Sequence, residues 1–292
     1  MSGGAGLEPR RYSRARRALF HLLEQTAVKL GGRRFYRKRF LSRKGLRVRH
    51  ERVVVPEWGA AVPRLRVVQL SDLHAGPFLG PGDLGEVCDV ANELAPDLFV
   101  MTGDLISKST EEAFWVLEDL ARLKAPHGAW AVFGNHDYRG RREGEIDERY
   151  RRESAWKFLR NGGQRFEHHG VFVHLTGLED LEEARRVDPV AARAELAPGD
   201  TEILLVHNPG FGNELLERNT RLVLSGHSHG HQINLPWIRR MAPRHPGNRI
   251  ERGGAVCVTS GGLGALGLPL RVGAPAEVVC VDLVAPSASE GA

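Results

Sequence analysis

Short apolar runs recur along the chain from residue 65 onward, and the stretches between them carry apolar residues at helical spacing. The runs predict buried strands at residues 65–70, 98–101, 129–133, 171–175, 203–206, 222–224, 255–259 and 278–281. The intervening patterns predict helices at residues 83–94, 110–123, 148–160, 181–195 and 213–218. The early strands and helices alternate, which favours an α/β fold built from layers of sheet and helix.

The first fifty residues follow a different pattern. Residues 12–30 predict an amphipathic helix, and residues 33–49 mix basic side chains with aromatic ones. The apolar side of the helix carries Ala15, Leu19, Leu22, Leu23 and Leu30. Residues 1–50 hold fifteen Lys and Arg against two Glu, a net charge of +13, so the remaining 242 residues carry −8 of the total of +5. We therefore expect a basic arm at residues 1–50 and one acidic domain at residues 51–286.

Within that domain, residues 139–160 are dense in charge and also contain Tyr150, Trp156, Phe158 and Leu159. This composition predicts a helical, cap-like insert between strands. A plain surface helix fits the same pattern.

The basic arm is too polar to span a membrane. His21, Glu24 and Lys29 interrupt its apolar run, which stays shorter than the roughly 20 residues that a span needs. No small-residue cleavage site follows, so a secretory signal is not expected. Basic residues beside an amphipathic helix fit an anionic membrane surface, and we predict this contact for residues 10–49. The same charge could bind nucleic acid, which is less favoured, or belong to a solvated helix docked on the body.

Cysteine usage bears on the compartment. Cys88, Cys257 and Cys280 lie far apart, are odd in number and form no CxxC pair, which fits a reducing compartment better than a disulfide framework. Together with the arm, this predicts a cytoplasmic protein peripheral to the inner face of the membrane. The sequence indicates no obligate protein partner.

Five of the predicted strands run directly into polar clusters. These clusters are Asp72-Leu73-His74, Gly103-Asp104, Gly134-Asn135-His136-Asp137, His207 and the heptapeptide Gly226-His227-Ser228-His229-Gly230-His231-Gln232. Open α/β sheets place their sites at the carboxyl ends of their strands. Residues i and i+2 of an extended chain point to the same side, so His227 and His229 can reach one small volume. Carboxylate, amide and imidazole ligands without thiolate suit Mn, Fe or Zn.

These clusters, in this order, match the pattern D-x-H, G-D, G-N-H-D/E, H and G-H-x-H. The chain therefore resembles the calcineurin-like metallophosphoesterase superfamily, whose fold is a four-layer α-β-β-α sandwich around two adjoining metal ions. The resemblance implies that Asp72, His74 and His229 bind the first ion. It implies that Asn135, His207 and His227 bind the second and that Asp104 bridges the pair. His136 corresponds to a histidine that binds no metal and lies beside the scissile phosphate.

The heptapeptide is similar to that of one membrane-attached branch of the superfamily, which includes enzymes resembling UDP-2,3-diacylglucosamine pyrophosphatases. That branch often has G-H-S/T-H-G-G-Q, whereas His231 replaces the second glycine here. Such enzymes commonly have an N-terminal membrane segment at the position that the basic arm occupies in this chain. A peripheral arm would hold the site close to a phosphate that remains in the bilayer.

The expected function is that of a dinuclear metal-dependent phosphoesterase acting on a phosphodiester or pyrophosphate bond of a lipid or nucleotide-lipid. Two ions about 3.5–4 Å apart supply positive charge and a bridging hydroxide for in-line attack on phosphorus. A carboxylate such as Asp104 can span two cations, and a protonated His136 can stabilise charge or donate a proton to the leaving group. Asp137 orients His136, supports the metal ligands from just outside them, or is a turn carboxylate. Mn is the favoured metal, with Fe and Zn as alternatives.

Two other functions fit parts of the pattern. A nuclease or nucleotide phosphoesterase would use the arm to bind nucleic acid. A non-catalytic scaffold recruited to membranes would keep the fold, but such proteins are marked by degenerate ligand positions, and none of the seven is lost here.

Overall fold

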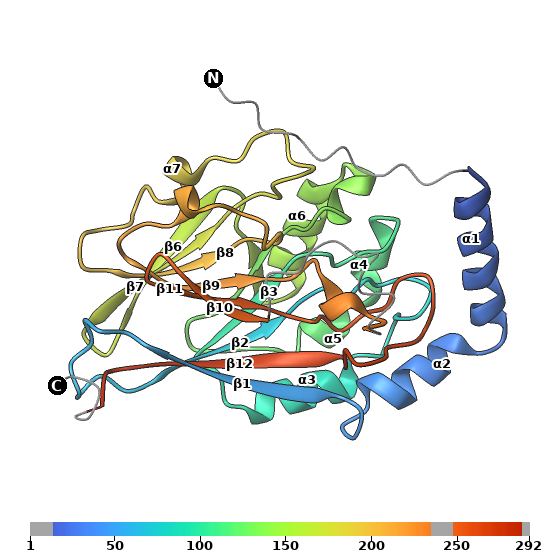
Figure 1. The fold of residues 1–292 in the computed structure, drawn as a ribbon, viewed down its shortest axis with the longest axis horizontal. Coiled ribbons are helices and arrows are strands. Elements are labelled where there is room, and N and C mark those ends of the chain that lie inside the picture. Colours follow the sequence, from blue (N-terminus) through green and yellow to red (C-terminus); the bar gives the residue numbers. More distant parts are fainter. Residues whose placement is uncertain (1–13, 235–247, 288–292) are drawn as a thin grey trace.

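Two six-stranded sheets pack face to face in the computed structural model, which describes residues 14–234 and 248–287, with side chains from residue 22 on (Figure 1). The first sheet has the order β1 (Arg47–Val54), β12 (Glu277–Val284), β2 (Leu65–Leu70), β3 (Leu98–Thr102), β4 (Ala129–Val132) and β5 (Trp156–Phe158). The second has the order β10 (Arg249–Arg252), β11 (Ala255–Thr259), β9 (Thr220–Ser225), β8 (Thr201–Leu205), β7 (Val171–Gly177) and β6 (Gly162–His168).

Most neighbouring strands are parallel, and the antiparallel pairs are β12–β2, β10–β11 and β6–β7. In the first sheet Val67 lies opposite both Val281 and Leu98. The parallel strands β2, β3 and β4 therefore end along one edge of that sheet, and β7, β8 and β9 end along one edge of the other.

Three apolar clusters separate four layers. Successive strand residues face opposite sides, so Val67 packs between the sheets whereas Val68 packs against helices on the outer face of the first sheet. Those helices are α3 (Gly85–Glu93), α4 (Glu111–Trp115), α5 (Leu117–Leu120) and α6 (Glu143–Glu153). The outer face of the second sheet is covered by a thinner layer containing α7 (Pro189–Ala192) and the 3₁₀ turn η3 (Asn213–Leu215). The expected four-layer α-β-β-α sandwich is confirmed.

Some expected elements differ from the structure. The helix expected at residues 181–195 is helical only at α7, because residues 182–186 are mostly charged and offer little apolar surface to bury. The helix expected at 213–218 is the short turn η3.

The stretch 139–160 is also not one helix. It contains α6, which ends at Glu153, where Ser154 Oγ donates to the carbonyl of Tyr150 at 2.6 Å. The chain then becomes the edge strand β5, and Trp156 is fully buried. The helix expected at 148–160 is therefore wrong beyond Glu153.

The arm forms α1 (Arg14–Lys29), α2 (Gly32–Tyr36) and a π-helical turn, η1 (Arg37–Leu41), before entering β1. In Figure 1, α1 stands at one end of the molecule, away from the sheets. Residues 1–13, and the side chains of Ala15 and Leu19, lie outside the described residues. No helix in the described part of the chain combines the length and apolar character needed to cross a bilayer.

The second half of the arm is docked on the body. The apolar cluster on the outer face of the first sheet includes three buried residues of the arm, Tyr36, Phe40 and Leu41. Arg33 forms an ion pair with the buried Asp83, and Glu24 of α1 pairs with Lys108. Residue 50, the expected end of the arm, lies inside β1, which pairs with β12 along its whole length.

Tyr36 ties the arm to the glycine-rich loop that follows β11. Its hydroxyl lies 2.7 Å from the carbonyl oxygen of Leu263 and 2.8 Å from that of Gly264, and it accepts a hydrogen bond from Arg271 Nε at 2.8 Å. The ring is fully buried, and burial raises the pKa of the phenol. The hydroxyl therefore acts as a neutral junction between the arm and this loop.

Replacing Tyr36 by Phe should lower the free energy of unfolding by about 1–3 kcal/mol, because it leaves the buried carbonyl of Leu263 without its hydrogen bond. Urea denaturation followed by circular dichroism measures this change. Phe35, the preceding residue, has 49% of its surface exposed, so Phe35→Leu, which keeps most of its apolar contact with Phe40, should change stability by less than about 0.5 kcal/mol. Equal effects of the two substitutions would contradict the docking role of Tyr36.

Candidate metal centre

The strand ends of both sheets bring the seven expected ligands together. The first sheet contributes Asp72 and His74 after β2, Asp104 after β3 and Asn135 after β4. The second sheet contributes His207 after β8 and both His227 and His229 after β9. The candidate centre therefore lies where the carboxyl ends of the two sheets meet.

Four of these residues form one tight group. The ligand atoms of Asp72, His74, Asp104 and His229 all lie within 4.8 Å of one another, and all four residues are buried. Nε2 of His74 is 2.9 Å from Nε2 of His229 and 3.4 Å from Oδ2 of Asp104. Nε2 of His229 is 3.6 Å from Oδ1 of Asp72.

The other three form an adjoining group. Oδ1 of Asn135 lies 3.2 Å from Nε2 of His207 and 3.1 Å from Nδ1 of His227, and these two nitrogens are 3.3 Å apart. Oδ2 of Asp104 lies 3.4 Å from Nε2 of His207, the same distance as from His74. One carboxylate oxygen thus faces both groups.

The donor atoms in these groups fit divalent cations. Nδ1 of His74 lies 3.2 Å from the carbonyl oxygen of Ile106, and Nδ1 of His207 lies 2.7 Å from that of Thr102. A carbonyl only accepts, so each Nδ1 carries the hydrogen and each Nε2 directs a lone pair inward. Convergent lone pairs repel one another unless a cation lies between them, and imidazole nitrogen and carboxylate oxygen bind such cations at about 2.0–2.2 Å.

The pKa values of the group around His74 agree with this view. Burial, with Arg271 nearby, lowers the pKa of His229 to about 3, and burial and His136 hold the pKa of His74 well below its usual value. Both imidazoles are therefore neutral, which is the form that binds metal. Burial acts to raise the pKa of Asp104, but neighbouring histidines, led by His207, bring it well below its usual value.

His207 differs from the other histidines. Burial acts to lower its pKa, but Asp104 outweighs burial and raises it to about 10. A proton and a cation therefore compete for the same lone pair of His207.

The loops hold these side chains in strained backbone conformations. Five of the seven candidate ligands have left-handed φ angles, which cost most residues about 1–3 kcal/mol. They are Asp72 (48°), His74 (44°), Asp104 (54°), His227 (70°) and His229 (51°). Such strain persists only where the surrounding structure imposes it, and it concentrates at functional sites.

Two glycines allow the loops to approach one another. A Cβ at Gly134 would collide with Asp104 Oδ1, and one at Gly226 would collide with Ser71 Oγ and Asp72 Oδ2. Where Gly226 approaches Asp72, the backbone N–H of His227 donates to Asp72 Oδ1 at 2.9 Å.

Asp137 joins two of the loops. Its carboxylate accepts from the backbone N–H groups of Leu105 and Ile106 at 2.8 and 3.1 Å, and from that of Gly134 at 2.8 Å. These bonds fix the Asp104 loop to the Asn135 loop. Asp137 is therefore a turn carboxylate that also supports the ligand loops, and none of these hydrogen bonds is made to His136.

His136 lies beside the first group, with its ring centroid 4.6 Å from that of His74. Its Nδ1 is 3.1 Å from the carbonyl oxygen of Ser107, and its Nε2 accepts a hydrogen bond from Arg139 Nη2 at 2.9 Å. Burial lowers the pKa of His136. Arg139 lies in the charged insert expected at residues 139–160, and its position three residues after His136 is the one sequence signal for its place in the site.

A family model for calcineurin-like phosphoesterases matches residues 65–231, a range that includes all seven candidate ligands. The chain belongs to the calcineurin-like metallophosphoesterases. As a member of this family it is a hydrolase of phosphoric esters, and its candidate centre implies divalent metal ions.

Named relatives agree with this family. The chain is 30% identical over 226 residues to the uncharacterized metallophosphoesterase YkuE of Bacillus subtilis (strain 168), covering 75% of this chain and 78% of the relative. It is 29% identical over 227 residues to UDP-2,3-diacylglucosamine pyrophosphatase LpxG of Chlamydia trachomatis, covering 63% and 69%. The solved NAD nucleotidase of Haemophilus influenzae matches with a TM-score of 0.49 and 16% identity, covering 69% of this chain and 46% of that one.

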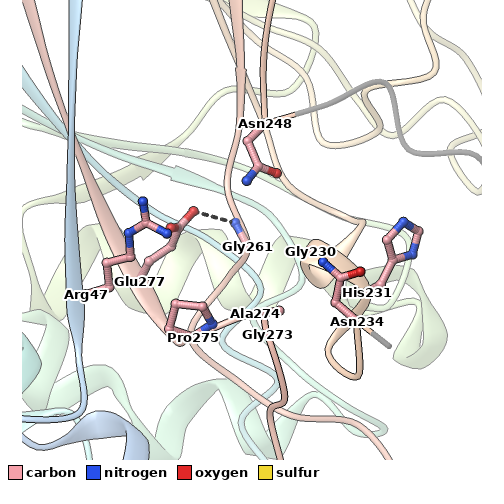
Figure 2. A pocket seen from close by; sticks show the side chains of 10 residues that line it. All are labelled: Arg47, Gly230, His231, Asn234, Asn248, Gly261, Gly273, Ala274, Pro275 and Glu277. Carbon is pink, nitrogen blue, oxygen red and sulfur yellow. Dashed lines mark hydrogen bonds between the residues drawn. The ribbon is translucent and has the colours of Figure 1, made fainter. Parts of the chain in front are cut away.

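A cavity of about 210 Å³ lies behind the turn η4 (His229–His231) of this metallophosphoesterase. Figure 2 shows Arg47 and Glu277 on one side of it, and Asn234 and His231 on the other. Glu277 is buried and accepts a hydrogen bond from the backbone N–H of Gly261 at 2.8 Å. Arg47, from the end of the basic arm, therefore lines a cavity next to the metal-site loop.

Gly226→Ala should displace Asp72 and lower both metal content and hydrolysis. A misplacement of about 1 Å costs about 10²-fold in rate, so we expect a loss of that order in kcat/KM. Elemental analysis and hydrolysis of bis(p-nitrophenyl) phosphate measure the two effects. Gly59→Ala is the matched control, because no atom lies within 4 Å of a Cβ built there. Unchanged metal content in Gly226→Ala would contradict the close approach to Asp72.

Proposed function

We propose that this metallophosphoesterase has a dinuclear centre and hydrolyses a phosphodiester or pyrophosphate bond in a lipid or nucleotide-lipid at a membrane surface. The observation that carries the dinuclear assignment is the position of Asp104 Oδ2, 3.4 Å from a histidine nitrogen in each donor group. A carboxylate oxygen placed in this way suits two cations better than one.

We assign the seven residues to two ions. Asp72, His74 and His229 would hold the first ion, Asn135, His207 and His227 would hold the second, and Asp104 would serve both. When bound, the two ions supply positive charge and a nucleophilic hydroxide at neutral pH. Nitrogen and oxygen donors without thiolate suit Mn, Fe or Zn, and among these metals we propose Mn.

His136 and Arg139 complete the site from the protein side. The Arg139 guanidinium donates both to His136 Nε2 and, at 2.7 Å, to the carbonyl of Ser107, which fixes its position beside the centre. A fixed guanidinium suits a phosphate that gains charge during the reaction. We therefore assign Arg139 to phosphate binding. In the arrangement described, His136 is neutral and its Nε2 accepts from Arg139, so it stabilises charge on the phosphate or protonates the leaving oxygen only after its Nε2 releases Arg139 and takes up a proton.

The lipid assignment is supported by the arm and by one loop. Leu22, Leu23 and Leu30 expose 62%, 41% and 82% of their surfaces. The loop that contains Pro269 lies against the arm, since a Cβ at Gly32 would collide with Pro269 Cγ. Gln232 Nε2 donates to three carbonyls of the same loop at 3.0–3.2 Å, which links it to the metal-site turn. The relative LpxG is named as a pyrophosphatase of a lipid-linked substrate.

Residues 22–30 would then contact the surface through their leucines, while the basic residues of the arm attract anionic headgroups. We propose a peripheral location on the cytoplasmic face of the membrane. Several arm cations already have acidic partners on the body, including Arg33 with Asp83 and Arg43 with Glu93, so the apolar contact carries more weight in this proposal than charge alone.

Asp104→Asn should lower kcat/KM for bis(p-nitrophenyl) phosphate by about 10³-fold or more, because a neutral amide is a poor ligand for two cations. Circular dichroism should show a retained fold, and elemental analysis should show reduced metal. Removing metal with EDTA should abolish wild-type hydrolysis, and Mn²⁺ should restore it. Asp89→Asn, at a 45%-exposed side chain paired with Arg122, is the matched control. Full activity in Asp104→Asn would refute the dinuclear centre.

Replacing Leu22, Leu23 and Leu30 together by Gln should strongly reduce flotation with vesicles that contain phosphatidylglycerol. The substitution keeps the charge and removes apolar area worth about 25 cal/mol per Å². Val190→Gln, at an 82%-exposed site in α7, should leave flotation unchanged. The nuclease alternative predicts a different result. Neither the wild type nor the triple variant would float with vesicles, and both would shift single-stranded DNA in a gel in a salt-dependent way.

A further inference from the structure

The loop at residues 264–270 has an entirely apolar sequence, although part of it is exposed. It consists of Gly, Ala, Leu and Pro alone. The residues that are at least partly exposed are Leu266, Gly267, Leu268, Pro269 and Leu270. Leu270 exposes 39% of its surface. From residue 260 to residue 276 the one ionisable side chain is that of Arg271, and it is buried. Leucines exposed on a loop without charge suit an apolar partner.

The side chain of Gln232 binds the backbone of this loop. Its Nε2 donates to the carbonyls of Leu266, Leu268 and Leu270 at 3.2, 3.0 and 3.1 Å. Its Oε1 accepts from the N–H of Leu266 at 2.9 Å. The N–H groups of Leu268 and Leu270 donate to carbonyls of the loop itself at 2.8 Å, and Pro269 has no N–H. Because these polar groups are bonded within the protein, moving the loop out of water costs less.

Other contacts order the loop from its base and from the arm. The guanidinium of Arg271 donates to the carbonyl of Gly264 at 2.6 Å and to the hydroxyl of Tyr36 at 2.8 Å. A Cβ at Gly32 would lie 2.9 Å from Pro269 Cγ. The loop is therefore ordered before it meets a partner, so binding costs little conformational entropy.

The arm beside this loop supplies both apolar area and positive charge. Leu30, two residues before Gly32, exposes 82% of its surface. Arg34 and Lys38 are exposed, and neither forms an ion pair with an acidic residue in the part of the chain that the structure describes. An apolar loop bordered by such cations matches a bilayer with anionic headgroups, because its charge and its apolar area then meet different layers of one partner.

The loop also lies close to the candidate metal centre. At its start, the N–H of Gly264 donates to the carbonyl of Asp72 at 2.7 Å. Gln232, which binds the rest of the loop, donates its own N–H to the carbonyl of His229 at 2.9 Å. Asp72 and His229 are both assigned to the first ion. A surface that touches this loop therefore lies beside the centre.

We propose that residues 266–270 form a loop that inserts into an anionic bilayer, at the boundary between headgroups and acyl chains. The inference rests on the proposed function and adds to it a second membrane contact, separate from the leucines of the arm. The arm would bind the bilayer, and the loop would hold the metal centre against the layer in which lipid phosphates lie.

Fluorescence from one labelled position tests the insertion. The three cysteines of the chain, Cys88, Cys257 and Cys280, are buried. The thiol introduced by Leu270→Cys can therefore be labelled selectively with the environment-sensitive dye NBD. Phosphatidylglycerol vesicles should raise its emission and shift it to shorter wavelength, and spin labels on lipid acyl chains should quench it. Val190→Cys, at an 82%-exposed position of α7, is the matched control and should show no change. Leu30→Cys reports on the arm.

Leu270→Gln measures how much the loop contributes to binding. This substitution should weaken flotation with the same vesicles by about tenfold, because it removes apolar area that the bilayer would cover. Leu270→Met keeps the apolar area and should float as the wild type does. Leu270 is partly exposed, so neither variant should lower the melting temperature. Wild-type flotation of Leu270→Gln would contradict the insertion.

The probes separate this inference from the proposed function. A Leu270 probe that ignores vesicles while the Leu30 probe responds would overturn the inserted loop and leave the contact of the arm in place. Emission at Leu270 that changes with protein concentration in the absence of lipid would identify a second copy of the chain as the partner, and would also overturn it. A Leu270 probe that responds to vesicles, in a protein that hydrolyses no diester with any divalent metal, would refute the proposed hydrolysis and leave the inserted loop standing.

Discussion

The structure depends on a buried carboxylate placed among imidazoles at the junction of two sheets. Asp104 is 2% exposed, and its Oδ2 faces histidine nitrogens contributed by both sheets. A buried charge is costly unless it is compensated, and in this arrangement the compensation that fits the inward lone pairs is cationic. The strained loops, the close approaches at Gly134 and Gly226, and the pinning of two loops by Asp137 all hold this one oxygen in position.

Much of the candidate centre was predictable because its information is local. Each cluster follows directly after an apolar run, and the parallel strands β2, β3 and β4 place Asp72, Asp104 and Asn135 at one edge without any knowledge of tertiary contacts. The two-residue spacing of His227 and His229 suggested a shared volume. The structure instead bends the chain there with φ angles of 70° and 51°, and the two rings point into adjoining groups. The pairing was thus anticipated, but not the backbone that produces it.

Other features depend on contacts distant in sequence and could not be predicted. Tyr36 contacts Leu263 and Gly264, which are more than two hundred residues away in the sequence. The sequence therefore suggested surface contact for the aromatic residues of the arm, whereas Tyr36 and Phe40 belong to the core. Arg139 lies in a stretch where charged residues are common. Only the position of its guanidinium next to His136 distinguishes it from the other charged residues of that stretch. The strand β5 was missed because its apolar residues follow α6 closely and continue the helical spacing.

The docking of the arm has a consequence for any surface that it touches. Glu24 pairs with Lys108, and Arg33 pairs with Asp83. Tyr36 contacts the loop at residues 263–264, whose backbone N–H groups donate to the carbonyls of Ser71 and Asp72. These contacts hold the arm against the body at three points. If the proposed membrane contact is made, they set the distance between the candidate metal centre and that surface, so the enzyme would select among bonds by their depth as well as by their chemistry.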